Sequence, residues 1–156
     1  MRSTLSRRIA LGLVIVAAGI QLVRPDRTNP PVDPARSLQA AAAVPSHVDG
    51  VLRRACYDCH SSETRWPWYS GVAPVAWGVA DHVKEGRAEF NLSEWGSYPA
   101  AKRVAVLEKI CAEVREGGMP LAQYVWLHRD ARLSEADRKM VCEWSTGEAA
   151  RLAASR

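Results

Sequence analysis

The sequence of 156 residues predicts an all-α domain preceded by an apolar helix at the N-terminus. Two observations predict this fold class. Apolar residues recur at three- and four-residue steps in several segments, which is the spacing of one helical face. No pair of segments combines strand-like alternation with a hairpin turn, so we expect no β-sheet. The length suits one domain plus an export segment.

The first 23 residues have the layout of a secretory signal or an N-terminal membrane anchor. Arg2, Arg7 and Arg8 precede a continuous apolar stretch over residues 9–23, and no acidic residue occurs before Asp26. We expect an uncleaved anchor, with a cleaved signal as the alternative. Arginines keep the N-terminus on the cytoplasmic side of the membrane. Both alternatives therefore place the domain outside the cytoplasm, in or facing the periplasm of a bacterial cell envelope.

The net charge of the chain is concentrated in this N-terminal segment. The formal net charge is +4, from 21 basic and 17 acidic side chains. Without the three N-terminal arginines the count is 18 against 17, a net charge of +1. The basic composition therefore gives no support to nucleic-acid binding.

Residues 24–45 are expected to form a semi-extended tether outside the core. They hold five of the nine prolines, at positions 25, 30, 31, 34 and 45, together with an alanine tract. Such a composition buries little apolar surface. The folded domain is then expected over residues 46–156.

The first domain helix is expected to lead into the most informative motif of the chain. A capping-box pattern at residues 46–49 begins it. One face of this helix carries Val48, Leu52 and Ala55. The helix then runs into Cys56.

Three further helices are expected from the same spacing. The second begins near Pro74, which suits a first helical turn, and is expected to stop at Gly86. The third covers residues 102–116 and ends at a pair of glycines. Its apolar face carries Val104, Leu107, Cys111 and Val114. The last begins with a capping-box pattern at residues 134–137.

The segment Cys56-Tyr57-Asp58-Cys59-His60 has the C-x-x-C-H spacing of covalent haem attachment. Two thiols three positions apart can each add to one vinyl group of a porphyrin, and the adjacent imidazole can ligate the iron. Three other interpretations of the motif fit less well. A thioredoxin-like redox pair would need a βαβ pattern, and a zinc site would need a second pair of closely spaced ligands, and the sequence shows neither. A disulfide between the two cysteines would leave His60 without a role. We therefore predict one covalent haem c on Cys56 and Cys59, with His60 as an iron ligand and the helical domain wrapped around the haem.

Met119 is the predicted second iron ligand. The sequence Gly117-Gly118-Met119-Pro120 places a thioether on a stiff turn directly after a helix. His82 and His128 are the alternative ligands, and an open sixth position is a further alternative.

Aromatic and cationic side chains near the motif are expected to contact the haem. Trp66, Trp68 and Tyr69 follow the motif closely and are expected to line one haem edge and exclude water, with ordinary packing as the alternative. Candidate partners of a haem propionate are Arg65, Arg87 and Arg103.

Cys111 and Cys142 lie on two different predicted helices, 31 positions apart. Outside the cytoplasm two remaining thiols tend to be oxidised together, so we expect a disulfide. Two separate buried thiols are the alternative.

The chain resembles the family of small bacterial haem-binding domain proteins with a single C-x-x-C-H site, over roughly residues 44–146. The residues that carry the resemblance are Cys56-Tyr57-Asp58-Cys59-His60-Ser61, Trp66-Pro67-Trp68-Tyr69, Ala73-Pro74-Val75-Ala76-Trp77, Glu85-Gly86-Arg87, Asn91-Leu92-Ser93-Glu94-Trp95, Gly118-Met119-Pro120, Tyr124 and His128. The resemblance implies haem c on Cys56 and Cys59, with His60 as the proximal ligand. Met119 matches the Met-Pro position of the family and the comparable element of class I cytochromes c.

These features favour a monohaem electron-transfer cytochrome with His/Met ligation, and not an enzyme. With both axial positions filled, no iron site remains for a substrate, and the expected partners are redox proteins at the membrane. The alternative is a haem-based sensor or peroxidase-like protein with an open or weakly held sixth position, where His82 or His128 would be the distal group. A haem-bearing interaction module in a larger complex is a third possibility.

Overall fold

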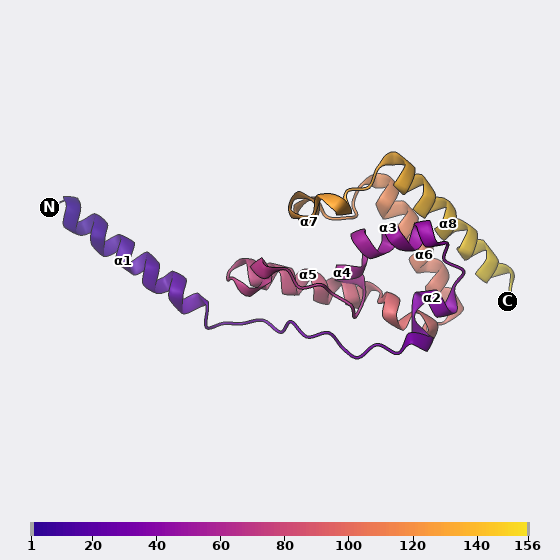
Figure 1. Cartoon of the computed structure of the whole chain (residues 1–156), viewed down its shortest axis with the longest axis horizontal. Helices are drawn as coiled ribbons and strands as arrows, with labels where there is room; N and C mark the ends of the chain where they lie inside the picture. Colours follow the sequence, from indigo (N-terminus) through magenta and orange to yellow (C-terminus); the bar gives the residue numbers. More distant parts are fainter. Residues whose placement is uncertain (1, 156) are drawn as a thin grey trace.

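The computed structural model describes residues 2–155, and within them it contains helices and loops without a strand (Figure 1). The α-helices are α1 (Arg2–Ile20), α2 (Leu38–Ala41), α3 (Ser46–Ala55), α4 (Tyr57–His60), α5 (Val75–Glu89), α6 (Ala100–Glu116), α7 (Ala122–Leu127) and α8 (Glu135–Ala154). The short 3₁₀ helices are η1 (Pro34–Arg36), η2 (Trp68–Gly71), η3 (Leu92–Ser97) and η4 (Arg129–Ala131). The predicted all-α class is confirmed.

The N-terminal helix α1 lies apart from the domain and is joined to it by an extended segment (Figure 1). Residues 4–19 are exposed to solvent. Among residues 2–155, no helix has both the length and the hydropathy that crossing a membrane requires. The export role of residues 1–23 stays a prediction.

The segment of residues 21–29, which we call the strap, is fixed to the domain. The Gln21 side chain forms two hydrogen bonds with the backbone of Ala73: its Nε2 donates to the carbonyl at 3.1 Å, and its Oε1 accepts from the amide at 3.0 Å. The Trp77 indole donates to the carbonyl of Val23 at 2.8 Å. The strap is therefore held to the domain by specific contacts, although residues 21–23 were assigned to the signal or anchor segment and residues 24–29 to the semi-extended tether.

The remainder of the proline-rich segment contributes to the core, which corrects the expectation that residues 24–45 lie outside it. Leu38 is 0% exposed, and Ala42 is also buried. The physical reason is the single turn of α2, whose first helical residue is Leu38 and whose N-cap, Ser37, accepts from the amide of Ala40. One large apolar side chain suffices to dock a segment that is otherwise poor in them.

The core lies between α3, α6, α8 and η3, on the opposite side of the domain from the strap and α5 (Figure 1). Helices α6 and α8 pack side by side along much of their length. Their buried side chains meet those of α3 and η3, and Leu52, Trp95, Leu107 and Val141 are among the most enclosed residues. The domain therefore has a helical core that is separate from the C-x-x-C-H motif.

A disulfide joins α6 to α8 and confirms the predicted pairing. Cys111 and Cys142 face each other with their Cα atoms 4.4 Å apart. The bond closes the loop that contains α7, η4 and the residues between them.

The four predicted domain helices are confirmed as α3, α5, α6 and α8. The capping box predicted at residues 46–49 does not form, because Pro45 is the N-cap of α3 and no side chain caps this helix. Gly117 ends α6 with a φ of 78°, the left-handed conformation that glycine adopts without steric cost. Ser134 and Asp137 form the predicted capping box of α8. Gly86 does not stop α5 as expected, because the helix continues to Glu89. Gly86 instead allows a close helix contact that is described below.

Candidate functional site

The C-x-x-C-H motif lies at the junction between α3 and α4. The amide of Cys56 donates to Leu52 at 2.8 Å, and the amide of His60 donates to Cys56 at 2.9 Å, so the motif continues the helix through one irregular residue. Cys56 and Cys59 are both free. Burial raises the pKa of Cys56 to about 12 and the pKa of Cys59 to about 11. Both are therefore neutral thiols at pH 7, unlike the thiolate nucleophile of a thiol–disulfide oxidoreductase.

His60 is buried and fixed on two sides. Its Nδ1 donates to the carbonyl of Gly86 at 2.9 Å, so the lone pair of the neutral ring is on Nε2. The ring stacks on Phe90 with centroids 4.0 Å apart and planes at 9°. Burial lowers the pKa of His60 and so favours the neutral imidazole. A backbone partner on Nδ1 is the usual arrangement for an iron-ligating histidine, because it fixes the tautomer and the ring orientation.

Helix α5 packs directly against the backbone of the motif at Gly86. A Cβ atom at this position would lie 2.6 Å from the carbonyl oxygen of Cys59. Only glycine permits this approach, which in turn brings the Gly86 carbonyl within reach of His60. The glycine therefore serves the motif in two ways.

Arg87 connects the residues that follow the motif to the strap. Its Nε donates to the carbonyl of Ser61 at 2.8 Å, and its Nη2 donates to Thr64 Oγ1 at 2.8 Å. The same guanidinium donates to the carbonyl of Thr28 at 3.1 Å and to Asn29 Oδ1 at 2.8 Å. Arg87 is thus occupied by structural hydrogen bonds, which leaves little of it for a haem propionate.

A cavity of about 250 Å³, which we call the motif cavity, lies between α5 and α7 beside Cys59. Tyr69 of η2 and His82 of α5 line it, as do Tyr124 and His128 at α7. Most of the remaining lining side chains are apolar. The structure thus brings one attachment cysteine, one predicted aromatic residue and both alternative histidine ligands to the same cavity.

A polar network closes one side of the motif cavity. The Tyr124 hydroxyl donates to Asp58 Oδ2 at 2.7 Å, and Asp58 Oδ1 accepts from the amide of Arg65 at 3.0 Å. The Tyr124 ring stacks on His128 at 4.2 Å, and the Tyr69 hydroxyl lies 3.3 Å from His128 Nε2. Desolvation and the Asp58 carboxylate raise the pKa of Tyr124, which keeps its proton.

Sequence reasoning did not assign roles to Asp58 and Tyr124. The available signals were the position of Asp58 between the two cysteines and the place of Tyr124 in the family resemblance. Neither signal indicates that the two side chains meet, because 66 positions separate them.

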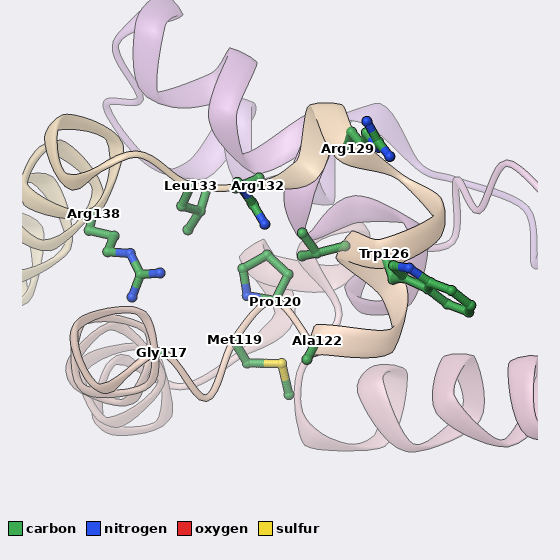
Figure 2. A pocket seen from close by; sticks show the side chains of 10 residues that line it. Gly117, Met119, Pro120, Ala122, Trp126, Arg129, Arg132, Leu133 and Arg138 are labelled. Atoms are coloured by element: carbon green, nitrogen blue, oxygen red, sulfur yellow. The ribbon is translucent and has the colours of Figure 1, made fainter.

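A larger cavity of about 680 Å³ lies on the other side of α7, and Met119 lines it (Figure 2). We call it the arginine cavity, because its lining includes Arg129, Arg132 and Arg138. Side chains of α7 and its ends alternate between the two cavities. Leu121 and Tyr124 line the motif cavity, whereas Trp126 lines the arginine cavity.

The predicted site residues therefore divide among several places. Cys59 and Tyr69 line the motif cavity, and Met119 lines the arginine cavity. His60 lines neither of these two cavities. Trp68 is 83% exposed, and the Trp66 indole donates to Asn29 of the strap at 3.1 Å. The chemistry of the donor set fits a haem, since two free thiols lie one helical turn apart beside an imidazole whose Nδ1 is held by Gly86.

Comparison with known proteins identifies the family. A haem-binding domain family matches residues 15–147, which include the strap, the motif and the lining of both cavities. No curated protein and no solved structure matches the chain. The matched residues cover most of the sequence and contain a thiol and imidazole donor set that suits haem. The chain therefore belongs to the haem-binding domain family.

Proposed function

We propose that this protein carries haem c on Cys56 and Cys59 and serves as an electron-transfer cytochrome. The observation that carries the proposal is the motif turn, where two free thiols accompany a histidine whose Nδ1 is held by Gly86. Each thiol would add across one vinyl group, forming a carbon–sulfur bond while its hydrogen goes to the other vinyl carbon. The addition needs no external oxidant.

His60 would be the proximal ligand through Nε2. The carbonyl of Gly86 and the ring of Phe90 keep the imidazole in one orientation, and the hydrogen bond on Nδ1 raises the basicity of Nε2. The haem would supply a one-electron change between ferric and ferrous iron. The fixed ligand lowers the structural reorganisation that accompanies this change.

Met119 is the proposed second axial ligand. It lies in the arginine cavity, two residues before Leu121, which lines the motif cavity. The amides of Gly118 and Met119 both donate to the carbonyl of Glu113, so the turn that carries Met119 is fixed to the end of α6. A thioether ligand favours ferrous iron and so raises the reduction potential. His82 and His128 are the alternatives, because both line the motif cavity beside Cys59.

The polar network of the motif cavity favours a second candidate function. If the sixth position is open or weakly held, His128, Tyr69 and Tyr124 would surround a small ligand of the iron. Such groups supply the proton donors and acceptors that a haem-based sensor or a peroxidase-like protein requires.

The location and partners of the domain belong to the same proposal. We expect it to work in the cell envelope outside the cytoplasm, with redox proteins at the membrane as partners. The arginine-rich start, the apolar stretch that follows it and the disulfide between Cys111 and Cys142 support this location.

The proposal is tested by exporting the full chain in a host that matures c-type cytochromes. Mass spectrometry should show one covalent haem in the wild type and none in the double variant Cys56→Ala, Cys59→Ala. Absorption spectra should show low-spin iron, no response to carbon monoxide and a methionine-to-iron charge-transfer band. The band should be absent from Met119→Ala and present in His82→Ala and His128→Ala.

Three results would contradict parts of the proposal. A wild-type protein without covalent haem, despite competent maturation, would overturn haem c attachment. High-spin iron that binds carbon monoxide would reject electron transfer through a closed site and favour the sensor or peroxidase-like function. Loss of low-spin iron in His82→Ala or His128→Ala would assign the sixth position to that histidine.

A further inference from the structure

Large apolar side chains are exposed at one end of the domain. Figure 1 shows α7 and the first part of α5 at the end that faces α1. Among residues 2–155, the exposed large hydrophobic side chains outside α1 all lie in the strap, in or beside η2, at the start of α5 and in α7. We call this set the end patch; it consists of Leu22, Val23, Trp68, Val72, Val75, Trp126 and Leu127.

The parts of the end patch are held next to one another. The hydrogen bonds of Gln21 with Ala73 fix the strap to the start of α5. The Tyr69 hydroxyl lies 3.3 Å from His128 Nε2 and so joins η2 to the end of α7. Val75 of α5 and Leu127 of α7 line the motif cavity together. The end patch is therefore one region made of three segments that are far apart in the sequence.

The segments that carry the end patch are uncharged. Residues 66–80 and residues 117–128 contain no aspartate, glutamate, lysine or arginine, although charged residues make up 24% of the chain. A charged side chain would have to lose its water on contact with an apolar partner, and these segments avoid that cost. A connected apolar surface of this kind marks a site of contact with a protein or a membrane.

Continuity with α1 indicates which of the two occupies the end patch. The apolar side chains of α1 are exposed as well, and α1 ends at Ile20, directly before the residue that fixes the strap to the domain. Leu22 and Val23 then continue the exposed apolar surface of α1 into the end patch. A single apolar phase that covers α1 therefore also reaches the end patch, and a lipid bilayer is such a phase.

The tryptophans and the charge of the strap suit the boundary of a bilayer. Trp126 is 80% exposed, and Figure 2 shows its indole directed away from Met119 and Leu133. An indole has an apolar body and a polar N–H group, so it is stable where lipid meets water. The strap adds exposed Arg24 and Arg27 against one acidic residue, and such basic side chains attract anionic head groups.

We propose that the end patch rests on the surface of a phospholipid bilayer, with Trp68 and Trp126 at the level of the head groups. The inference rests on the proposed location in the cell envelope and adds a second membrane contact to the one expected of residues 1–23. Because Val75 and Leu127 also line the motif cavity, this cavity would open at the bilayer. The haem would then exchange electrons with a partner held in the membrane and not with a freely diffusing protein.

Photolabelling by lipid tests this contact on the full chain with its haem. The protein is reconstituted in vesicles of phosphatidylethanolamine and phosphatidylglycerol that include a phospholipid with a diazirine on its acyl chain. After illumination, mass spectrometry of peptides locates the lipid adducts. We expect adducts in residues 66–77 and 122–127 in addition to α1, and none in α8, whose exposed side chains include Glu135, Lys139 and Glu143.

The double variant Trp68→Ser, Trp126→Ser should weaken the contact of the domain while keeping α1. Adducts in residues 66–77 and 122–127 should fall several-fold, and adducts in α1 should stay as in the wild type. Leu5→Ser is the matched control, because it also removes a large exposed apolar side chain, but from α1. This control should keep the adducts of the domain. An equal fall in both variants would overturn the inference, since the domain would then follow α1 without a contact of its own.

A protein that covers the end patch is the other occupant that the apolar surface would fit. In that case the vesicles would give adducts on α1 alone, and this result would overturn the lipid contact while keeping the N-terminal anchor. A wild type without any adduct would overturn both. The absorption spectrum reports the haem separately, so neither result bears on haem attachment or on the iron ligands.

Discussion

At the residue scale, Gly86 is the position where the smallest change should have a large effect. An added methyl group would meet the backbone carbonyl of Cys59 at 2.6 Å, and a backbone atom cannot rotate away as a side chain can. We expect Gly86→Ala to lower the free energy of unfolding of the haem-free protein by about 1–3 kcal/mol, as in other overpacked cores. Denaturant unfolding followed by circular dichroism measures the change.

Gly147→Ala is the control for this substitution. Gly147 is also inside a helix, but nothing lies within 4 Å of its added Cβ. Alanine should therefore stabilise α8 by about 0.5–1 kcal/mol through its better helix propensity. If Gly86→Ala were as stable as Gly147→Ala, the close contact between α5 and the motif would be wrong.

The same scale shows what the sequence can specify at the site. The placement of Cys56, Cys59 and His60 on one helical turn was predictable because it depends on local spacing, whereas their roles toward haem stay a prediction. The hydrogen bond between Tyr124 and Asp58 depends on how α7 packs, and no local pattern encodes a contact across 66 positions. The location of Met119 in a different cavity from Cys59 was unpredictable for the same reason.

At the scale of elements, the strap gives a prediction of its own. Asn29 donates to the carbonyl of Thr64 at 2.8 Å and accepts from Trp66 and Arg87. Asn29→Ala removes these three hydrogen bonds, each of which contributes about 0.5–1.5 kcal/mol. We expect amide hydrogen exchange over residues 61–73 to become at least about tenfold faster, which corresponds to about 1.4 kcal/mol.

Thr28→Ala tests whether this effect is specific to the strap contact. Thr28 accepts from Arg87 through its backbone carbonyl, which the substitution keeps. Its side chain bonds only within the strap, to Asp26. Exchange over residues 61–73 should remain close to that of the wild type, and equal acceleration in both variants would contradict the special role of Asn29.

Elements with a strong apolar period were predicted well, and elements held by other means were not. The spacing of apolar residues located α3, α5, α6 and α8, because each buries one helical face. α7 has no buried residue, so it leaves no such pattern. The attachment of the strap was not predicted, because it depends on hydrogen bonds from Gln21 and Val23 to residues about 50 positions away, which no local pattern encodes.

For the whole molecule, the disulfide is the strongest constraint outside the haem motif. It closes a loop of 31 positions, and a cross-link of this length stabilises a folded domain by about 3–4 kcal/mol in the chain-entropy account. Cys111→Ser combined with Cys142→Ser should lower the free energy of unfolding by a similar amount. Urea unfolding of the haem-free protein measures this loss.

The control for the double serine variant is the wild type in the presence of a reductant, because both lack the disulfide. Both should unfold at a similar urea concentration, below that of the oxidised wild type. If the oxidised and reduced proteins unfolded at the same urea concentration, the disulfide between α6 and α8 would contribute nothing to stability. The core alone would then account for the packing of these helices.

The two cysteine pairs give this chain opposite requirements during its biogenesis. Cys111 and Cys142 must lose electrons to form their bond, whereas the proposed thioether formation would require Cys56 and Cys59 to remain reduced. Four cysteines allow three complete pairings, and all three consume Cys56 and Cys59: two join them to α6 and α8, and one joins them to each other. Early docking of α6 on α8 would bring Cys111 and Cys142 together first. The helix pair that stabilises the mature domain would then also keep Cys56 and Cys59 from being cross-linked to α6 and α8 before the cofactor arrives.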